Sequence, residues 1–127
     1  MPAQRGGGTD PCSKRVLIVE DELMIRMLLE DMLAELGYAV AASATRLDEA
    51  LSIASSGDFD VAILDVNLEG QASSPVADVL ATRGTPFLFA TGYGQRGLPE
   101  HYRNRPTLKK PFQIESLRRM LHDMLQP

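Results

Sequence analysis

Residues 16–22 read Val-Leu-Ile-Val-Glu-Asp-Glu, an unbroken apolar run that ends abruptly in three acids. Short apolar runs rich in β-branched residues are typical of strands in a parallel sheet that is covered on both faces. Three similar runs and a weaker one follow, at Tyr38–Ala42, Val61–Leu64, Phe87–Ala90 and Thr107-Leu108. The sequence therefore predicts a sheet of five buried strands, of which residues 16–19 form the first.

Helical patterns lie between these runs. Residues 25–36 place apolar side chains along one wide helical face, and Gly37 follows in the position of a C-cap. A shorter apolar stripe covers residues 47–54, and another runs over residues 114–125. Strands that alternate with helices predict a doubly wound α/β domain with right-handed crossovers, built from five strand–helix units.

Proline and glycine mark the two remaining helical slots. We expect Ser74 to cap a helix that has Pro75 in its first position and that ends at Gly84. The slot at residues 92–106 is rich in glycine, so any helix there is short and begins near Pro99. This segment is predicted to be the most mobile part of the domain.

Size and composition indicate one globular domain. The 127 residues are 44% hydrophobic and carry a net charge of −4, which gives nucleic acid no general attraction, so no direct DNA binding is expected. Residues 1–13, with two prolines and three consecutive glycines, are predicted to be a disordered tail, and residues 14–127 to be the domain. The sequence lacks a signal peptide and an apolar run of about 20 residues, so we expect no membrane association. Cys12 is the only cysteine, which favours a reducing, cytoplasmic setting.

Polar residues follow four of the predicted strands. Because ligands bind beyond the carboxyl ends of strands in open α/β sheets, we expect these residues to converge on one edge. A loop composition that is merely polar would explain any one of them but not all four groups together. They are Glu20-Asp21-Glu22, Asp65-Val66-Asn67, Thr91-Gly92 and Lys109-Lys110-Pro111.

Such a cluster suits phosphoryl transfer. Glu20, Asp21 and Asp65 would repel one another unless a proton or a cation neutralised them, and carboxylate oxygens are the ligands that Mg²⁺ prefers. Lys110 would add a second positive charge and Thr91 a hydroxyl donor, which together disperse charge from a transferring phosphoryl group. Asp65, at the centre, is then the expected nucleophile, and it would form an acyl phosphate.

Four motifs in order resemble the receiver domain of two-component response regulators. They are Val-Leu-Ile-Val-Glu20-Asp21-Glu22, Ala-Ile-Leu-Asp65-Val-Asn67-Leu, Phe-Ala-Thr91-Gly92 and Lys110-Pro111-Phe112. The resemblance covers residues 15–126. It implies a CheY-like, flavodoxin-like three-layer (βα)5 sandwich with parallel strand order 2-1-3-4-5. The run Phe-Ala-Thr-Gly-Tyr at residues 89–93 also resembles the FAT GUY subgroup of stand-alone receivers.

The resemblance implies a role for each site residue. Asp65 would accept a phosphoryl group from a histidine kinase or a histidine phosphotransfer protein, and Thr91 and Lys110 would contact that group. Mg²⁺ would be held by Asp21, Asp65 and the main-chain carbonyl of Asn67, with Glu20 acting directly or through water. The Lys110–Pro111 peptide bond is expected to be cis. Output would pass to a downstream protein by contact or onward phosphotransfer, and the chain would catalyse only its own phosphorylation and dephosphorylation rather than act as an enzyme on other molecules.

Two positions depart from the family pattern. Glu20 stands where an aspartate is more common, and its extra methylene moves the carboxylate. Thr107 stands where the family has an aromatic switch residue, three positions before the lysine. Tyr93 or Tyr102, in the glycine-rich segment, is a hypothetical substitute.

Two other functions remain open from the residues alone. One is an interaction module that is never phosphorylated, against which the complete set of Asp65, Thr91 and Lys110 argues. The other is a Mg²⁺-dependent phosphatase. Phosphatases of the haloacid dehalogenase type need a second acid two residues after the nucleophile, where this chain has Asn67.

Overall fold

The computed structural model of the protein describes residues 14–68, 70–92, 98, 102 and 105–125. The predicted tail at residues 1–13, with Cys12, lies outside the described residues. So does most of the predicted mobile segment at residues 92–106, including the short helix expected near Pro99.

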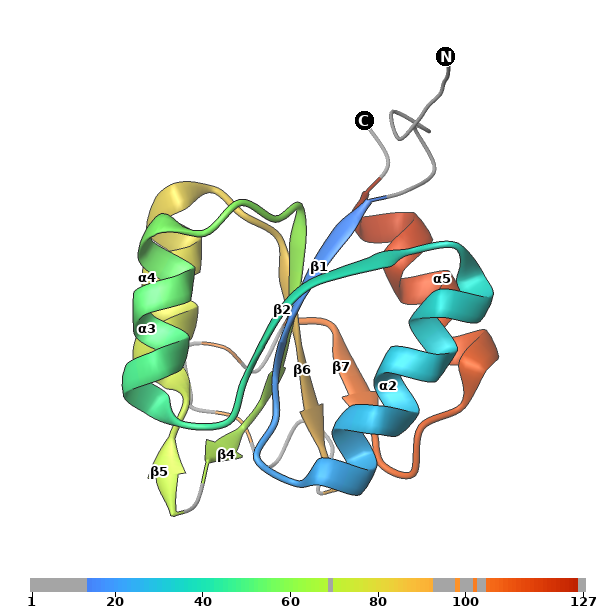
Figure 1. Ribbon diagram of the computed structural model, residues 1–127, viewed down its shortest axis with the longest axis horizontal. Helices are drawn as coiled ribbons and strands as arrows, with labels where there is room; N and C mark the ends of the chain where they lie inside the picture. Colours follow the sequence, from blue (N-terminus) through green and yellow to red (C-terminus); the bar gives the residue numbers. More distant parts are fainter. Residues whose placement is uncertain (1–13, 69, 93–97, 99–101, 103–104, 126–127) are drawn as a thin grey trace.

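Five parallel strands form the central sheet. The sheet has the order β2-β1-β3-β6-β7 (Figure 1), which confirms the expected order of the five long strands. The strands are β1 (Arg15–Val19), β2 (Ala39–Ala44), β3 (Val61–Asp65), β6 (Phe87–Thr91) and β7 (Thr107–Lys109). The second strand lies slightly later than the predicted residues 38–42, because its pairing with β1 continues until Ala44 lies opposite Val19.

Four helices among the described residues cover the two faces of the sheet, which confirms the three-layer architecture. Helices α2 and α5 lie on one face and α3 and α4 on the other (Figure 1). Their bounds are Leu23–Leu36 for α2, Leu47–Ser56 for α3, Ser74–Arg83 for α4 and Ile114–Met124 for α5. None of the helices in the described part of the chain is both long and apolar enough to span a membrane.

The alternation of side chains along β1 explains why its apolar run is unbroken. Leu17 and Val19 pack into the core under α3 and α4, whereas Val16 and Ile18 pack into the core under α2 and α5. Successive side chains of a strand point to opposite faces, so a strand covered on both faces needs apolar residues at every position. All four of these side chains are fully buried.

Helix ends follow the glycines, but one predicted cap is wrong by a residue. Gly37 and Gly84 have φ of 92° and 75°, in the left-handed region that favours glycine, and they end α2 and α4 as expected. The N-cap of α4 is Ser73 rather than Ser74, because the Ser73 carbonyl accepts the first helical hydrogen bonds, from the N–H groups of Val76 and Ala77.

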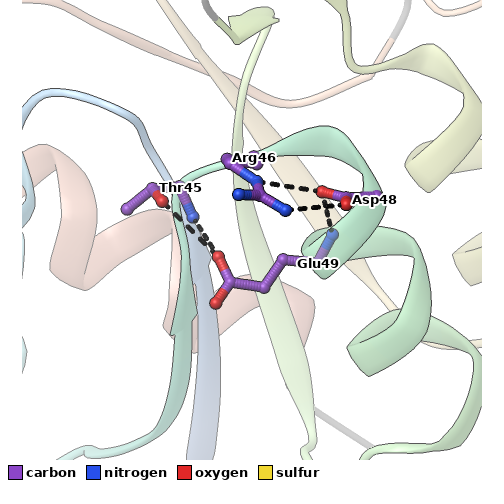
Figure 2. Close-up of polar contacts among 4 residues, drawn as sticks. All are labelled: Thr45, Arg46, Asp48 and Glu49. Atoms are coloured by element: carbon purple, nitrogen blue, oxygen red, sulfur yellow. Dashed lines mark hydrogen bonds and ion pairs between the residues drawn. The ribbon is translucent and has the colours of Figure 1, made fainter.

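Side chains around its first turn stabilise the start of α3. Figure 2 shows that Glu49 reaches back so that its carboxylate accepts the backbone N–H of Thr45 at 2.9 Å. Asp48 accepts the N–H of Glu49 at 2.8 Å and pairs with Arg46 at 2.8 Å, and this pairing lowers the pKa of Asp48. Both acids lie in the first turn, where the helix dipole favours negative charge.

A small ribbon that the sequence pattern did not reveal follows β3. Strands β4 (Asn67–Leu68) and β5 (Gln71–Ala72) pair in antiparallel fashion, away from the main sheet (Figure 1). Gly70 has φ of 86°, and its N–H donates to Oδ1 of Asn67 at 2.8 Å. The ribbon lies directly after Asp65 and therefore shapes the loop beside that residue.

Candidate phosphoacceptor and metal site

The residues expected at the carboxyl edge of the sheet do meet there. Glu20 and Asp21 follow β1, Asp65 ends β3, Thr91 ends β6 and Lys110 follows β7. Four strands that are parallel neighbours therefore deliver their end residues to one place. All of them except Glu20 line an open pocket of about 420 Å³. The other residues that line this pocket are Glu22, Val66, Asn67 and Gly92.

Lys110 connects the two buried acids. Its Nζ lies 3.2 Å from Oε1 of Glu20 and 3.4 Å from Oδ1 of Asp65. Its backbone N–H donates to the carbonyl of Thr91 at 3.0 Å, which fixes the lysine against β6. The Lys110–Pro111 peptide bond is cis, as the resemblance implies. The amine of Lys110 thus faces the carboxylate to which a phosphoryl group would be bonded.

Glu20 is a buried acid. Only 1% of the residue is exposed, and this burial raises its pKa to about 7, against the opposing effects of the Glu22 N–H and of Lys110. Oε2 accepts the N–H of Glu22 at 3.1 Å. Oε1 lies near Lys110 but, among the described residues, receives no aligned hydrogen bond. A buried carboxylate oxygen that accepts no hydrogen bond lowers the stability of the fold, and a bound cation would offset this cost.

The oxygen cluster fits a divalent cation. Carboxylate oxygens of Glu20, Asp21 and Asp65 all lie within 4.8 Å of one another. The candidate ligand atoms are all oxygens, which suits Mg²⁺. Oε1 of Glu20, which accepts no hydrogen bond from the described residues, is an atom that a cation or its bound water would satisfy. Asn67 lines the same pocket, where its carbonyl is the fourth expected ligand.

The pKa values of Asp65 and Lys110 are both raised, for different reasons. Burial raises the pKa of Asp65, although Lys110 and a hydrogen bond from the Asn67 N–H act against this effect. Burial alone would lower the pKa of Lys110, but the carboxylates of Asp65 and Glu20 outweigh it and leave the pKa raised. Lys110 is therefore a permanent cation between two acids that each favour a proton or a metal ion.

Thr91 and Tyr102 lie on the same side of β6. Thr91 is only 3% exposed, and it follows Phe87 and Phe89 on the side of the sheet that faces α3 and α4. The Tyr102 ring packs against both phenylalanines, with ring centroids 5.8 Å and 5.6 Å away. Thr107 supplies no ring from β7, so Tyr102 is the described aromatic residue that occupies this region.

Tyr102 is also tied to α4. Its hydroxyl donates to the carboxylate of Asp78, and burial with this acid raises the pKa of Tyr102 to about 12. Sequence patterns offered no signal for this contact, because the two residues are 24 positions apart and belong to different elements. Tyr93, the other proposed substitute for the missing aromatic residue, lies outside the described residues.

Comparison with known proteins identifies the family. The family model for the response regulator receiver domain matches residues 16–122 of this chain. The transcriptional regulatory protein PdtaR of Mycobacterium tuberculosis is 37% identical over 108 residues, which are 82% of this chain and 53% of PdtaR. The chain thus spans about half the length of that relative. A probable chemotaxis protein CheY of Rhizobium etli is 28% identical over 113 residues, 82% of this chain and 86% of that protein.

Solved structures give the same answer. SdrG from Sphingomonas melonis Fr1 superposes with a TM-score of 0.80 at 40% identity, covering 91% of this chain and 98% of SdrG. The receiver domain of the PhyR response regulator from Erythrobacter litoralis gives 0.75 at 30% identity, covering 91% and 95%. Both neighbours agree with the resemblance to a response regulator receiver domain that the sequence motifs imply. The chain belongs to the receiver domains of two-component response regulators.

Proposed function

We propose that this receiver domain accepts a phosphoryl group on Asp65 from a phosphohistidine of a histidine kinase or a phosphotransfer protein. The observation that supports this most directly is the position of Lys110, whose Nζ lies 3.4 Å from Oδ1 of Asp65; both residues line an open pocket. A carboxylate that faces both a cation and open space can receive a charged group and hold it.

The proposed reaction is a displacement at phosphorus. An Oδ atom of Asp65 attacks, the phosphorus–nitrogen bond to the donor imidazole breaks, and the imidazole leaves and regains its proton. Lys110 lies close enough to pair with an oxygen of the transferred group, and the Thr91 hydroxyl lines the same pocket. Glu20, Asp21, Asp65 and the Asn67 carbonyl would hold Mg²⁺, which would supply positive charge to the phosphoryl oxygens.

Hydrolysis of the acyl phosphate by water would return Asp65 to its starting state. We propose that the chain catalyses only these two steps on itself and is not an enzyme that turns over other substrates. A phosphohistidine donor would place this reaction in the cytoplasm, where ATP-dependent histidine kinases act.

An exposed apolar patch beside the pocket supports a protein donor. Leu23, Met24, Met27 and Leu28 lie in the first two turns of α2, and each is between 41% and 79% exposed. These residues follow the Glu20-Asp21-Glu22 run directly, so a protein that brings a phosphohistidine to Asp65 would also cover them. Met24→Glu should therefore slow transfer from a kinase and leave phosphorylation by the small donor acetyl phosphate unchanged.

Mass spectrometry after incubation with acetyl phosphate and Mg²⁺ tests the central proposal. The wild-type protein should gain one phosphate, and Asp65→Asn should gain none. Asp60→Asn, at an exposed acid before β3, is the matched control and should be phosphorylated like the wild type. A wild-type protein that gains no phosphate, or an Asp65→Asn protein that does, would favour the unphosphorylated interaction module or another acceptor.

A further inference from the structure

Ser73 is a buried polar residue without a role so far. Among the described residues, four polar or charged ones are buried, and three of them, Glu20, Asp65 and Thr91, belong to the site. The fourth is Ser73, which has no exposed surface. It lies between the β4–β5 ribbon and α4, on the loop that begins at Asp65.

The Ser73 hydroxyl is not used as its position would suggest. A serine at the N-cap of a helix commonly accepts a hydrogen bond from an N–H of the first turn. Ser73 is the N-cap of α4, but its side chain makes no such bond. Its Oγ instead donates to the carbonyl of Val66 at 3.1 Å, and its own N–H donates to the same carbonyl at 3.0 Å.

The peptide unit that Ser73 holds is also the one that faces Asp65. The carbonyl of Val66 and the N–H of Asn67 belong to one planar peptide, so they point in opposite directions and turn together. The Asn67 N–H lies close enough to the Asp65 carboxylate to act against the rise of its pKa, and Asp65, Val66 and Asn67 line the same pocket. Two donors on the Val66 carbonyl therefore fix the direction of that N–H, and they also polarise the peptide so that its N–H becomes a stronger donor.

We propose that Ser73 is a positioning residue for Asp65, acting through the Val66–Asn67 peptide. Its hydroxyl aims the Asn67 N–H at the carboxylate and holds Asn67 where its carbonyl can serve the cation site. The inference deepens the proposed function and rests on it. After phosphoryl transfer, the same N–H would face the added negative charge, where a fixed donor is most useful.

Ser73→Ala is the direct test, because it removes the hydroxyl and keeps the backbone N–H. Ser74→Ala, the same change at the next residue, is the matched control. In the metal-free protein, Ser73→Ala should move the Asn67 amide resonance, while Ser74→Ala should leave it in place. By calorimetry, Ser73→Ala should weaken Mg²⁺ binding by about 10-fold, the lower end of what loss of an outer partner of a metal site costs. Ser73→Thr, which retains the hydroxyl, should restore both properties.

The outcomes separate this inference from the proposed function. A Ser73→Ala protein with the wild-type Asn67 resonance and wild-type Mg²⁺ affinity would overturn the role of Ser73, even if Asp65 is phosphorylated. A wild-type protein that takes up no phosphate would overturn the proposed function, while the amide resonance and the Mg²⁺ affinity would still decide the role of Ser73. If Ser73→Ala does not fold, Ser73→Cys, of similar size but a weaker donor, should give a smaller change of the same kind.

Discussion

Nζ of Lys110 lies 3.4 Å from Oδ1 of Asp65, although 45 positions separate the two residues in the chain. The contact depends on the sheet order, which places β3 and β7 on either side of β6. It also depends on Lys110 reaching past the end of β6, where its N–H is held by Thr91.

Replacing Lys110 should slow phosphorylation sharply. In Lys110→Ala the phosphoryl group would lose the cation that lies 3.4 Å from Asp65, and we expect the rate with acetyl phosphate to fall by about 100-fold, as when one fixed donor is removed from a charged transition state. Lys109→Ala is the control, because Lys109 is exposed and contributes no residue to the pocket around Asp65. Equal rates for Lys110→Ala and Lys109→Ala would contradict the role of Lys110.

Without Mg²⁺, stability should fall as the pH rises. Burial raises the pKa of Glu20 from 4.5 to about 7, so the folded protein binds this proton more tightly than the unfolded chain does. The resulting stabilisation is complete below about pH 4.5 and is lost as the pH passes about 7, with a loss of up to about 3 kcal/mol. Urea denaturation in EDTA at pH 5 and pH 7.5 measures this difference.

Glu20→Gln isolates the effect of this acid. The amide does not titrate, so the variant should lose less stability than the wild type between the two pH values. Burial also raises the pKa of Asp65, and a smaller pH dependence of the same sign should therefore remain. A variant with the full wild-type pH dependence would show that Glu20 is ionised throughout this range.

Arg83 should stabilise the end of α3 from a neighbouring helix. Its guanidinium donates to the carbonyls of Ala54 and Gly57, the latter at 3.1 Å, and lies 5.2 Å from the centre of the Phe59 ring. Arg83→Ala leaves those carbonyls without this donor and should lower the free energy of unfolding by about 2 kcal/mol. Arg118→Ala removes only an exposed pair with Glu115 and should cost under about 1 kcal/mol in the same urea titration.

The hydroxyl and the ring of Tyr102 should contribute separately. Tyr102→Phe retains the packing on Phe87 and Phe89 but loses the hydrogen bond to Asp78, so it should cost about 1 kcal/mol of stability. Tyr102→Ala also leaves a cavity against the two rings and should cost about 3 to 5 kcal/mol. Thermal unfolding of both variants checks the order, and equal losses would assign the whole effect to the hydroxyl.

The sequence by itself determined the layers of the fold and the membership of the site. Unbroken apolar runs require cover on both faces of the sheet, and residues that follow parallel strands must gather at one edge. For this reason the sequence alone predicts a group of neighbouring site residues: Glu20, Asp21, Asp65, Thr91 and Lys110. Gly37 and Gly84 could be placed as helix ends because few other residues tolerate positive φ.

Only the tertiary structure decided how these neighbours interact. Local pattern does not encode contacts between distant segments, so it gave no sign that Lys110 is shared between Glu20 and Asp65, or that Tyr102 reaches Asp78. The same limit hid the β4–β5 ribbon and put the cap of α4 on Ser74. The hydroxyl of Ser73 donates to the Val66 carbonyl seven positions earlier. This hydrogen bond depends on the folded path of the loop after Asp65, which the sequence pattern does not specify.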